Sequence, residues 1–219
     1  MRRRGSRDQP SSAGCKAVRR RRRCAGDPDG GGGGHPLRSC DDVVADYSAR
    51  YAANAKDEMH WFRQPKSITE AIDRACESRL PNGRGRLVKH GHQSRIPASA
   101  LREAAAHLRA QGVAVSAAPD FRRLHDVVEA TIGSIAGIGE LAIYDIAHRI
   151  GAHRGLAPAE VYIHRGTRKG AIALRFSGRK TIAMRELPVA LQQLTAAQAE
   201  DVLCIYHGDL ARLRREGEC

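Results

Sequence analysis

The chain has 219 residues, with 37 Lys and Arg against 24 Asp and Glu, so its formal net charge is +13. This length suits one compact domain or two at most, and the charge favours a polyanionic partner. Residues 1–40 hold 11 basic and 3 acidic groups, which leaves 26 basic and 21 acidic groups, a net +5, for residues 41–219. Most of the basicity therefore belongs to the N-terminal segment.

Several classes of protein are excluded by the same arithmetic. No run approaches the roughly 18 consecutive apolar residues of a membrane span. The Arg-rich start is followed by Gly, Pro and Asp, which excludes a secretory signal peptide. The six cysteines lack a C-x-x-C pair, so free thiols in a reducing compartment are expected. The sequence predicts a cytoplasmic protein that has no membrane contact and no cofactor, and it gives no indication of oligomeric state.

Residues 1–38 combine two Arg clusters with the Gly30–Gly34 run and three prolines. Such a segment buries too little apolar surface to offset its ordering entropy, so it is expected to be a disordered basic tail. Two interpretations stay open. The tail is either a basic arm on phosphate backbones or an extension with no selected role, since the excess of Arg over Lys is also what a guanine- and cytosine-rich genome produces.

From residue 39 the pattern becomes helical. Apolar residues recur at three- and four-residue spacing over 43–56. Ser67 and Glu70 form a capping-box sequence that opens a helix through Cys76. Pro81-Asn82-Gly83 then forces a turn, and the basic, largely polar stretch 83–95 predicts an exposed loop.

Further helices are predicted over 97–112 and 121–135, and Gly112 is expected to end the first of them. A second capping box, Thr195 with Gln198, opens a final helix that runs through Leu213. Strand signals are scarce. The expected fold is therefore mainly α, with a single helical domain over 39–219.

The most informative segment lies between two predicted helices and reads Ile135-Ala136-Gly137-Ile138-Gly139-Glu140. Two glycines allow a tight turn and a close approach to another group, and the N-terminus of the following helix suits a phosphate oxygen. The segment resembles the helix-hairpin-helix motif, over about 121–151, which binds DNA backbones without reading sequence. A plain helix–helix connection with a glycine cap is the alternative.

The resemblance extends to the DNA glycosylases of the helix-hairpin-helix class. Their hairpin precedes a segment of the type Val-Asp-Thr-His, and Val161-Tyr162-Ile163-His164 occupies that place here. The catalytic Asp of that family would fall at Tyr162, and the nucleophilic Lys of some members at Leu141. The cysteine cluster that binds iron and sulfur in part of the family is also missing. The resemblance therefore implies DNA-binding geometry without glycosylase chemistry.

A basic segment follows the hairpin in the sequence. Arg165, Arg168 and Lys169 lie within five residues and are expected to line a backbone-binding groove, unless they form a solvated surface. The predicted nucleic-acid-binding residues are Gly137, Ile138, Gly139, Arg165, Arg168 and Lys169.

Other chemistry has weaker support. His90 and His92 could supply two metal ligands, with Cys76 or His60 as remote partners, but no supporting spacing accompanies them, so no metal site is predicted. Asp145 and His148 lie three residues apart on a predicted helix and are weak candidates for an acid–base pair. Asp145 could equally pair with Arg149.

Three functions remain open at this point. The first is sequence-independent binding of the DNA backbone, without catalysis. The second is a DNA-processing enzyme of the glycosylase or lyase kind, which would use unorthodox residues such as Asp145 or Asp120. The third is a structural or protein-interaction module, in which the two glycines form only a turn.

Overall fold

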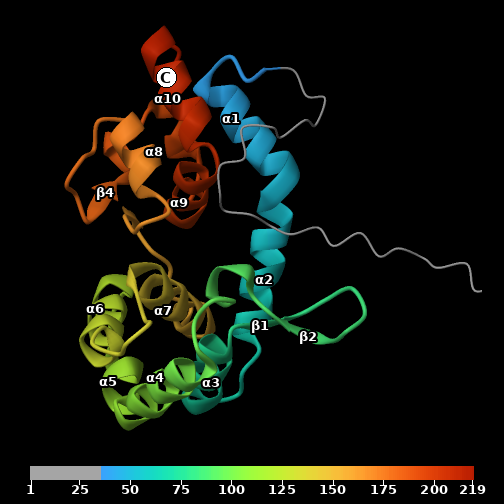
Figure 1. Ribbon diagram of the computed structural model, residues 1–219, viewed down its shortest axis with the longest axis vertical. Helices are drawn as coiled ribbons and strands as arrows, with labels where there is room; N and C mark the ends of the chain where they lie inside the picture. Colours follow the sequence, from blue (N-terminus) through green and yellow to red (C-terminus); the bar gives the residue numbers. More distant parts are fainter. Residues whose placement is uncertain (1–35) are drawn as a thin grey trace, which may run out of the picture.

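The computed structural model describes residues 36–219. Over this range the chain is mainly α-helical, which confirms the predicted fold class, and its apolar side chains form two separate cores. Figure 1 shows the two corresponding lobes, with a helical rod along one side. We call residues 53–159 the lower lobe, and residues 36–52 with 160–219 the upper lobe. The prediction of a disordered tail over 1–38 lies almost wholly outside the described residues.

The lower lobe is built around one buried helix. Its helices are α2 (Ala53–Arg63), α3 (Ile68–Glu77), α4 (Ala98–Ala110), α5 (Gly112–Ala117), α6 (Phe121–Ile132) and α7 (Glu140–Arg154). Helices α2, α3 and α6 all pack against α7, whose residues are buried on nearly every side. Side chains of α7 are therefore the ones that the lower lobe places most firmly.

Local signals explain where these helices begin. The Ser67 hydroxyl accepts a hydrogen bond from the N–H of Glu70 at 3.2 Å, so the predicted cap is present. Asp120 caps α6 in the same way, accepting from the N–H of Arg123 at 2.9 Å. The helix predicted over 97–112 is α4, which ends at Ala110 with Gln111 as its C-cap. A separate short helix that the sequence did not predict, α5, begins at Gly112 and buries Val115 in the core.

The basic stretch 83–95 is not the simple loop that its sequence predicts. Strands β1 (Arg79–Pro81) and β2 (Leu87–Lys89) pair antiparallel and form an arm that projects from the lower lobe (Figure 1). The Asn82 side chain closes the turn by accepting hydrogen bonds from the N–H groups of Arg84 and Arg86, each at 3.0 Å. A short 3₁₀ turn, η2 (Gly91–Gln93), follows the arm.

The upper lobe combines the two ends of the described chain. It holds α1 (Cys40–Tyr47), β3 (Glu160–Tyr162), α8 (Arg168–Ala173), β4 (Thr181–Ala183), the 3₁₀ turns η3 (Met184–Glu186) and η4 (Val189–Gln193), α9 (Ala196–Ile205) and α10 (His207–Glu216). The predicted capping box is present, with Thr195 and Gln198 bonded reciprocally. The single C-terminal helix of the prediction is instead two, because the chain bends at Tyr206, whose hydroxyl donates to Asp46 at 2.6 Å.

Two segments join the lobes. One is the rod, in which a π-helical turn, η1 (Ser48–Ala52), runs directly between α1 and α2. The rod places Tyr47 in the upper core and Phe62 in the lower lobe, and both side chains are almost fully buried. The other is β3, where Val161 packs in the upper core and its neighbour Tyr162 in the lower core. Alternation along a strand thus serves both cores.

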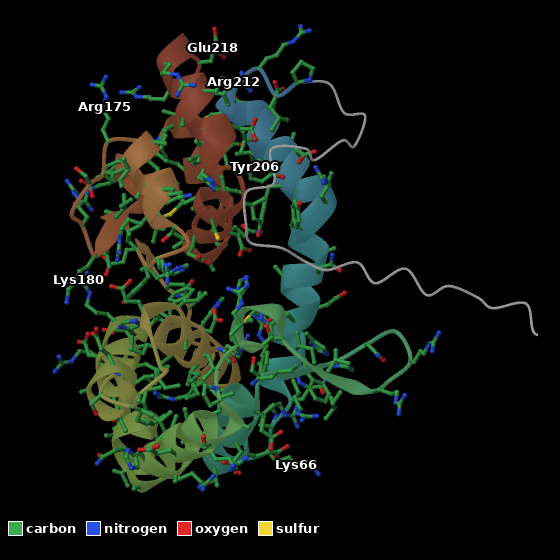
Figure 2. All side chains as sticks on the ribbon, viewed as in Figure 1. Lys66, Arg175, Lys180, Tyr206, Arg212 and Glu218 are labelled. Atoms are coloured by element: carbon green, nitrogen blue, oxygen red, sulfur yellow. A yellow bond between two sulfur atoms is a disulfide. The ribbon has the colours of Figure 1, made fainter. Side chains whose placement is uncertain are left out.

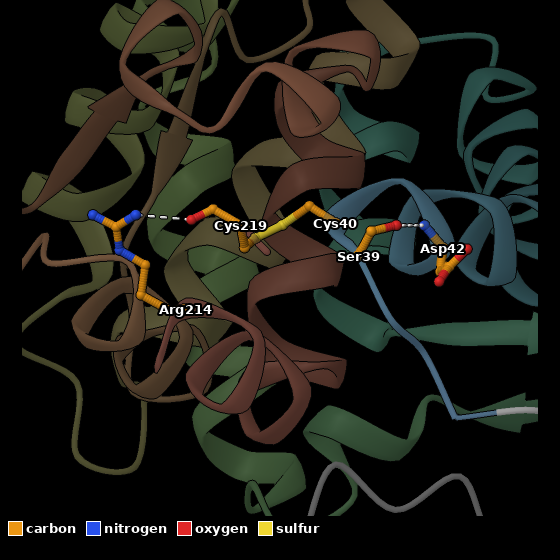
Figure 3. Close-up of a disulfide and its surroundings, with 5 residues drawn as sticks. All are labelled: Ser39, Cys40, Asp42, Arg214 and Cys219. Carbon is orange, nitrogen blue, oxygen red and sulfur yellow. Dashed lines mark hydrogen bonds between the residues drawn. A yellow bond between two sulfur atoms is a disulfide. The ribbon is translucent and has the colours of Figure 1, made fainter. Parts of the chain in front are cut away.

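A disulfide closes the upper lobe. Cys40 at the start of α1 is bonded to Cys219, and their Cα atoms lie 5.2 Å apart (Figure 3). The N–H of Cys40 also donates to the carbonyl of Glu218 at 3.2 Å. The expectation of free thiols is wrong for this pair, because folding brings together residues 179 positions apart in the sequence. Cys76 is a buried free thiol, as the sequence predicts. No described helix is long and apolar enough to span a bilayer.

Candidate functional site

A short glycine-containing turn joins α6 to α7. The turn places Gly137 at φ +91°, a conformation that favours glycine. Ile138 is buried between the two helices, whereas Gly139 is exposed. Among residues 36–219 no side chain caps the N-terminus of α7, and a Cβ on Gly139 would meet none of their atoms within 4 Å. The first N–H groups of α7 are therefore open to an external acceptor.

The basic segment meets this hairpin from the other lobe. Arg168, at the start of α8, binds both carboxylate oxygens of Glu140, at 2.8 and 3.1 Å. Arg165 and Lys169 lie on the same segment and are exposed. Lys180 adds a further cation at the level where the two lobes meet (Figure 2). The structure thus brings together the two groups of residues that the sequence proposed for DNA, although Glu140 places a negative charge among them.

The position that carries the catalytic Asp in the resembling glycosylases holds a packing residue. The ring of Tyr162 lies 4.5 Å from that of His125 and 5.6 Å from that of Tyr144, measured between centroids. Burial and the neighbouring Glu160 raise the pKa of its phenol to about 12. Leu141, at the position of the nucleophilic Lys, is half-buried on α7. Neither position supplies a carboxylate or an amine.

The histidine of that same segment is held in a buried pair. His164 is 2% exposed, and its Nε2 lies 2.6 Å from Oε1 of Glu200 on α9. Its Nδ1 accepts a hydrogen bond from the N–H of Gly166 at 3.1 Å, so in neutral His164 the proton sits on Nε2 and is donated to Glu200. This pair joins the segment between β3 and α8 to α9.

A second polar cluster lies inside the lower lobe, where η2, α2 and α7 meet. Arg149 on α7 is 2% exposed and donates to Ser78 at 2.9 Å, to Gln93 at 2.8 Å and to Glu58 at 3.3 Å. Gln93 in turn donates to Asp145 at 3.3 Å. Such a network satisfies the buried guanidinium, which is costly to bury without partners.

Two histidines face the carboxylates of this cluster. His90 Nε2 lies 3.4 Å from Oε2 of Glu58, and His92 Nδ1 lies 3.8 Å from Oδ2 of Asp145. Burial opposes ionisation of Asp145, but His92 and Arg149 outweigh it and lower the pKa of Asp145 to about 2. Asp145 is therefore ionised at neutral pH.

The acid–base pair proposed from spacing does not form. Among the described residues no hydrogen bond joins Asp145 to His148; Asp145 faces η2 instead, and the ring of His148 packs against Phe121 and Tyr144. Burial lowers the pKa of His148 to about 4. Arg149, the other partner that the sequence offers for Asp145, does lie close to it: its guanidinium is 3.9 Å from the Asp145 carboxylate. Asp120, the other unorthodox candidate, serves as the cap of α6.

Comparison with known proteins adds no family to these observations: no family model, curated protein or solved structure matches the chain. Function is therefore inferred from the residues themselves.

Sequence reasoning missed most members of the polar cluster. Glu58, Ser78 and Gln93 come from three separate segments, and none belongs to a motif. One signal was nevertheless present. Arg149 stands within the apolar run Ile146-Ala147-His148-Arg149-Ile150, and a charge on the buried side of a helix requires buried partners.

Proposed function

We propose that this protein binds the backbone of duplex DNA, without reading its sequence, through the surface formed by Gly137, Ile138, Gly139, Arg165, Arg168 and Lys169. We call this surface the hairpin face. The contact between Arg168 and Glu140 carries the proposal, because it joins the basic segment to the hairpin across the boundary between the lobes.

Each part of the hairpin face has a defined role in this proposal. The open N–H groups at the start of α7 bind one phosphate, and the positive end of the helix dipole favours the anion. Arg165 and Lys169 neutralise neighbouring phosphates, while Ile138 holds the turn in place from inside. Backbone contacts of this kind position a protein on DNA but carry no sequence information.

Glu140 opposes the binding of phosphate at this surface. Its carboxylate competes with phosphate for Arg168 and repels the DNA, so binding of a phosphate requires Arg168 to leave Glu140. Both side chains are more than half exposed, at 51% and 57%, and an exposed pair of this kind contributes at most about 1 kcal/mol. Phosphate oxygens, which bind arginine in the same two-pronged way, can therefore displace it.

The test is a titration of the full chain onto a fluorescent duplex of random sequence at several salt concentrations. Replacement of both Arg165 and Lys169 by Ala should weaken binding and reduce the slope of log affinity against log salt by about 0.9 for each phosphate that is no longer neutralised. The matched control replaces Arg84 and Arg86 by Ala, which removes the same charge from the arm, on the side of the molecule away from α8 (Figure 1). Equal slopes for both double variants would contradict the proposal.

A further inference from the structure

We propose that His90, His92 and Asp145, joined by Glu58, bind one divalent transition-metal ion where η2, α2 and α7 meet. One ligand atom from each of the first three side chains lies within 4.8 Å of the others. Glu58 adds a carboxylate oxygen 3.4 Å from Nε2 of His90. This site is separate from the hairpin face, and it does not depend on DNA binding.

The set of donors selects the class of metal. Two imidazole nitrogens with two carboxylate oxygens suit Zn²⁺, Fe²⁺ or Ni²⁺, whereas Ca²⁺ and Mg²⁺ prefer oxygen alone. The charges also favour a cation. Two carboxylates face a single guanidinium, that of Arg149, so with neutral histidines the cluster has a net charge of −1.

Hydrogen bonds around Asp145 and His90 would orient these side chains as metal ligands. Gln93 is fully buried and donates to Oδ2 of Asp145, while Arg149 holds Gln93 from behind. The N–H of His90 is anchored to the carbonyl of Ser78 at 2.7 Å, which fixes the start of the turn that carries both histidines. Hydrogen bonds of this kind orient ligands and raise the affinity of metal sites.

The cluster needs a small contraction to hold an ion. Two ligands bound to one metal at about 2.1 Å are at most about 4.2 Å apart, whereas the ligand atoms of His90, His92 and Asp145 lie within 4.8 Å of one another. Glu58 would join them by moving in from its place beside His90. The metal would replace the contact between His92 and Asp145. Coordination through Nε2 of His90 would move its proton to Nδ1, at the loss of the 3.3 Å bond from the N–H of His92. His92 lies on the three-residue turn η2 and His90 is its N-cap, and His92 is 30% exposed, so these movements need no change in the core.

The competing occupant is the proton. Protonated His90 and His92 would pair with Glu58 and Asp145 and balance their charge without any metal. The experiment therefore uses the full chain, freed of metal with a chelator, and titrates it calorimetrically with Zn²⁺ at pH 7.5. Titration with Co²⁺ alongside reports the ligand type from its visible spectrum.

We expect one Zn²⁺ per chain and a thermal midpoint that rises with zinc. The variants His92→Ala and Asp145→Asn should each bind at least tenfold more weakly, and His107→Ala, which removes an exposed histidine of α4, should bind like the parent. His92→Ala alters a partly exposed side chain, so it tests the site even if Asp145→Asn fails to fold. No binding, equal binding by the His92 variant, or a cobalt–thiolate absorption band that assigns the metal to cysteines would each overturn the proposal.

Discussion

The replacement Gly139→Asp separates the fold of the hairpin from its binding. Gly139 has extended backbone angles, φ −114° and ψ 178°, and open space around its Cβ, so an Asp fits there without strain. Asp is a favourable N-cap and lies at the positive end of the helix dipole. The free energy of unfolding should therefore stay equal or rise by up to about 1 kcal/mol.

The same Asp should weaken DNA binding. Its carboxylate takes the N–H groups proposed for phosphate and repels that phosphate. At a separation of about 5 Å and an effective dielectric constant of about 20 to 80, the repulsion is roughly 1–3 kcal/mol. That range corresponds to an affinity about 5- to 150-fold lower. Glu140→Gln should have the opposite effect, because it removes a negative charge from the same place.

The assays are urea unfolding for stability and fluorescence anisotropy with a random duplex for affinity. Gly139→Asn is the control, since it has the shape and capping ability of Asp without its charge. Unchanged affinity for Gly139→Asp would refute the proposed role of the hairpin. Loss of stability in the same variant would refute our description of the open N-terminus of α7.

Three further predictions concern the two lobes. Arg149→Met leaves Glu58 with His90 as its remaining partner and deprives the buried Ser78 and Gln93 of their donor. It should lower the free energy of unfolding by about 3–5 kcal/mol, measured by urea unfolding; a loss no larger than that of the exposed Arg122→Met, below about 1 kcal/mol, would contradict the network. Burial and the neighbouring Glu200 raise the pKa of Asp201 to about 7, so the folded state holds a proton that the unfolded state has lost, and stability falls as pH rises from about 4 to 7. Asp201→Asn should therefore be more stabilising at pH 8 than at pH 4, and an equal effect at both would count against it. Cys40→Ser should lower the free energy of unfolding by about 2–5 kcal/mol, because the disulfide closes a long loop, and dithiothreitol should then cause no further loss; an unchanged urea midpoint for the variant would show that the bond contributes no stability.

The sequence predicts helix caps and helices where the residues that form them are close neighbours in the chain. The capping box at Thr195 formed as predicted, because both of its partners lie within four residues. At Ser67 only the cap itself formed, since Glu70 accepts from the N–H of Lys66 instead of that of Ser67. The helices on either side of Gly137 and Gly139 followed from apolar periodicity. The arm did not, because the hydrogen bonds that close it come from the side chain of Asn82, and strand pairing over three residues leaves little trace in the sequence.

The two candidate sites differ in the same way: one is contiguous in the sequence and the other is not. The hairpin was found from sequence because its glycines and flanking apolar residues are contiguous. The polar cluster was not, since Glu58 and Arg149 are 91 residues apart and Gln93 and Asp145 are 52 apart. The sequence indicates His90 and His92 as a pair of potential ligands. Their expected partners, Cys76 and His60, do not belong to the cluster, whose third member is Asp145.

The sequence by itself determined that the protein is mainly helical, where its main helices begin, and that a glycine hairpin joins two of them, since these properties depend on contacts between near neighbours in the chain. Only the tertiary structure decided that there are two cores, that Arg168 reaches Glu140 at the hairpin, and that Cys40 meets Cys219. It also placed two histidines and two carboxylates around a buried guanidinium. These arrangements depend on which apolar faces pack together, and that choice is made by the whole chain at once.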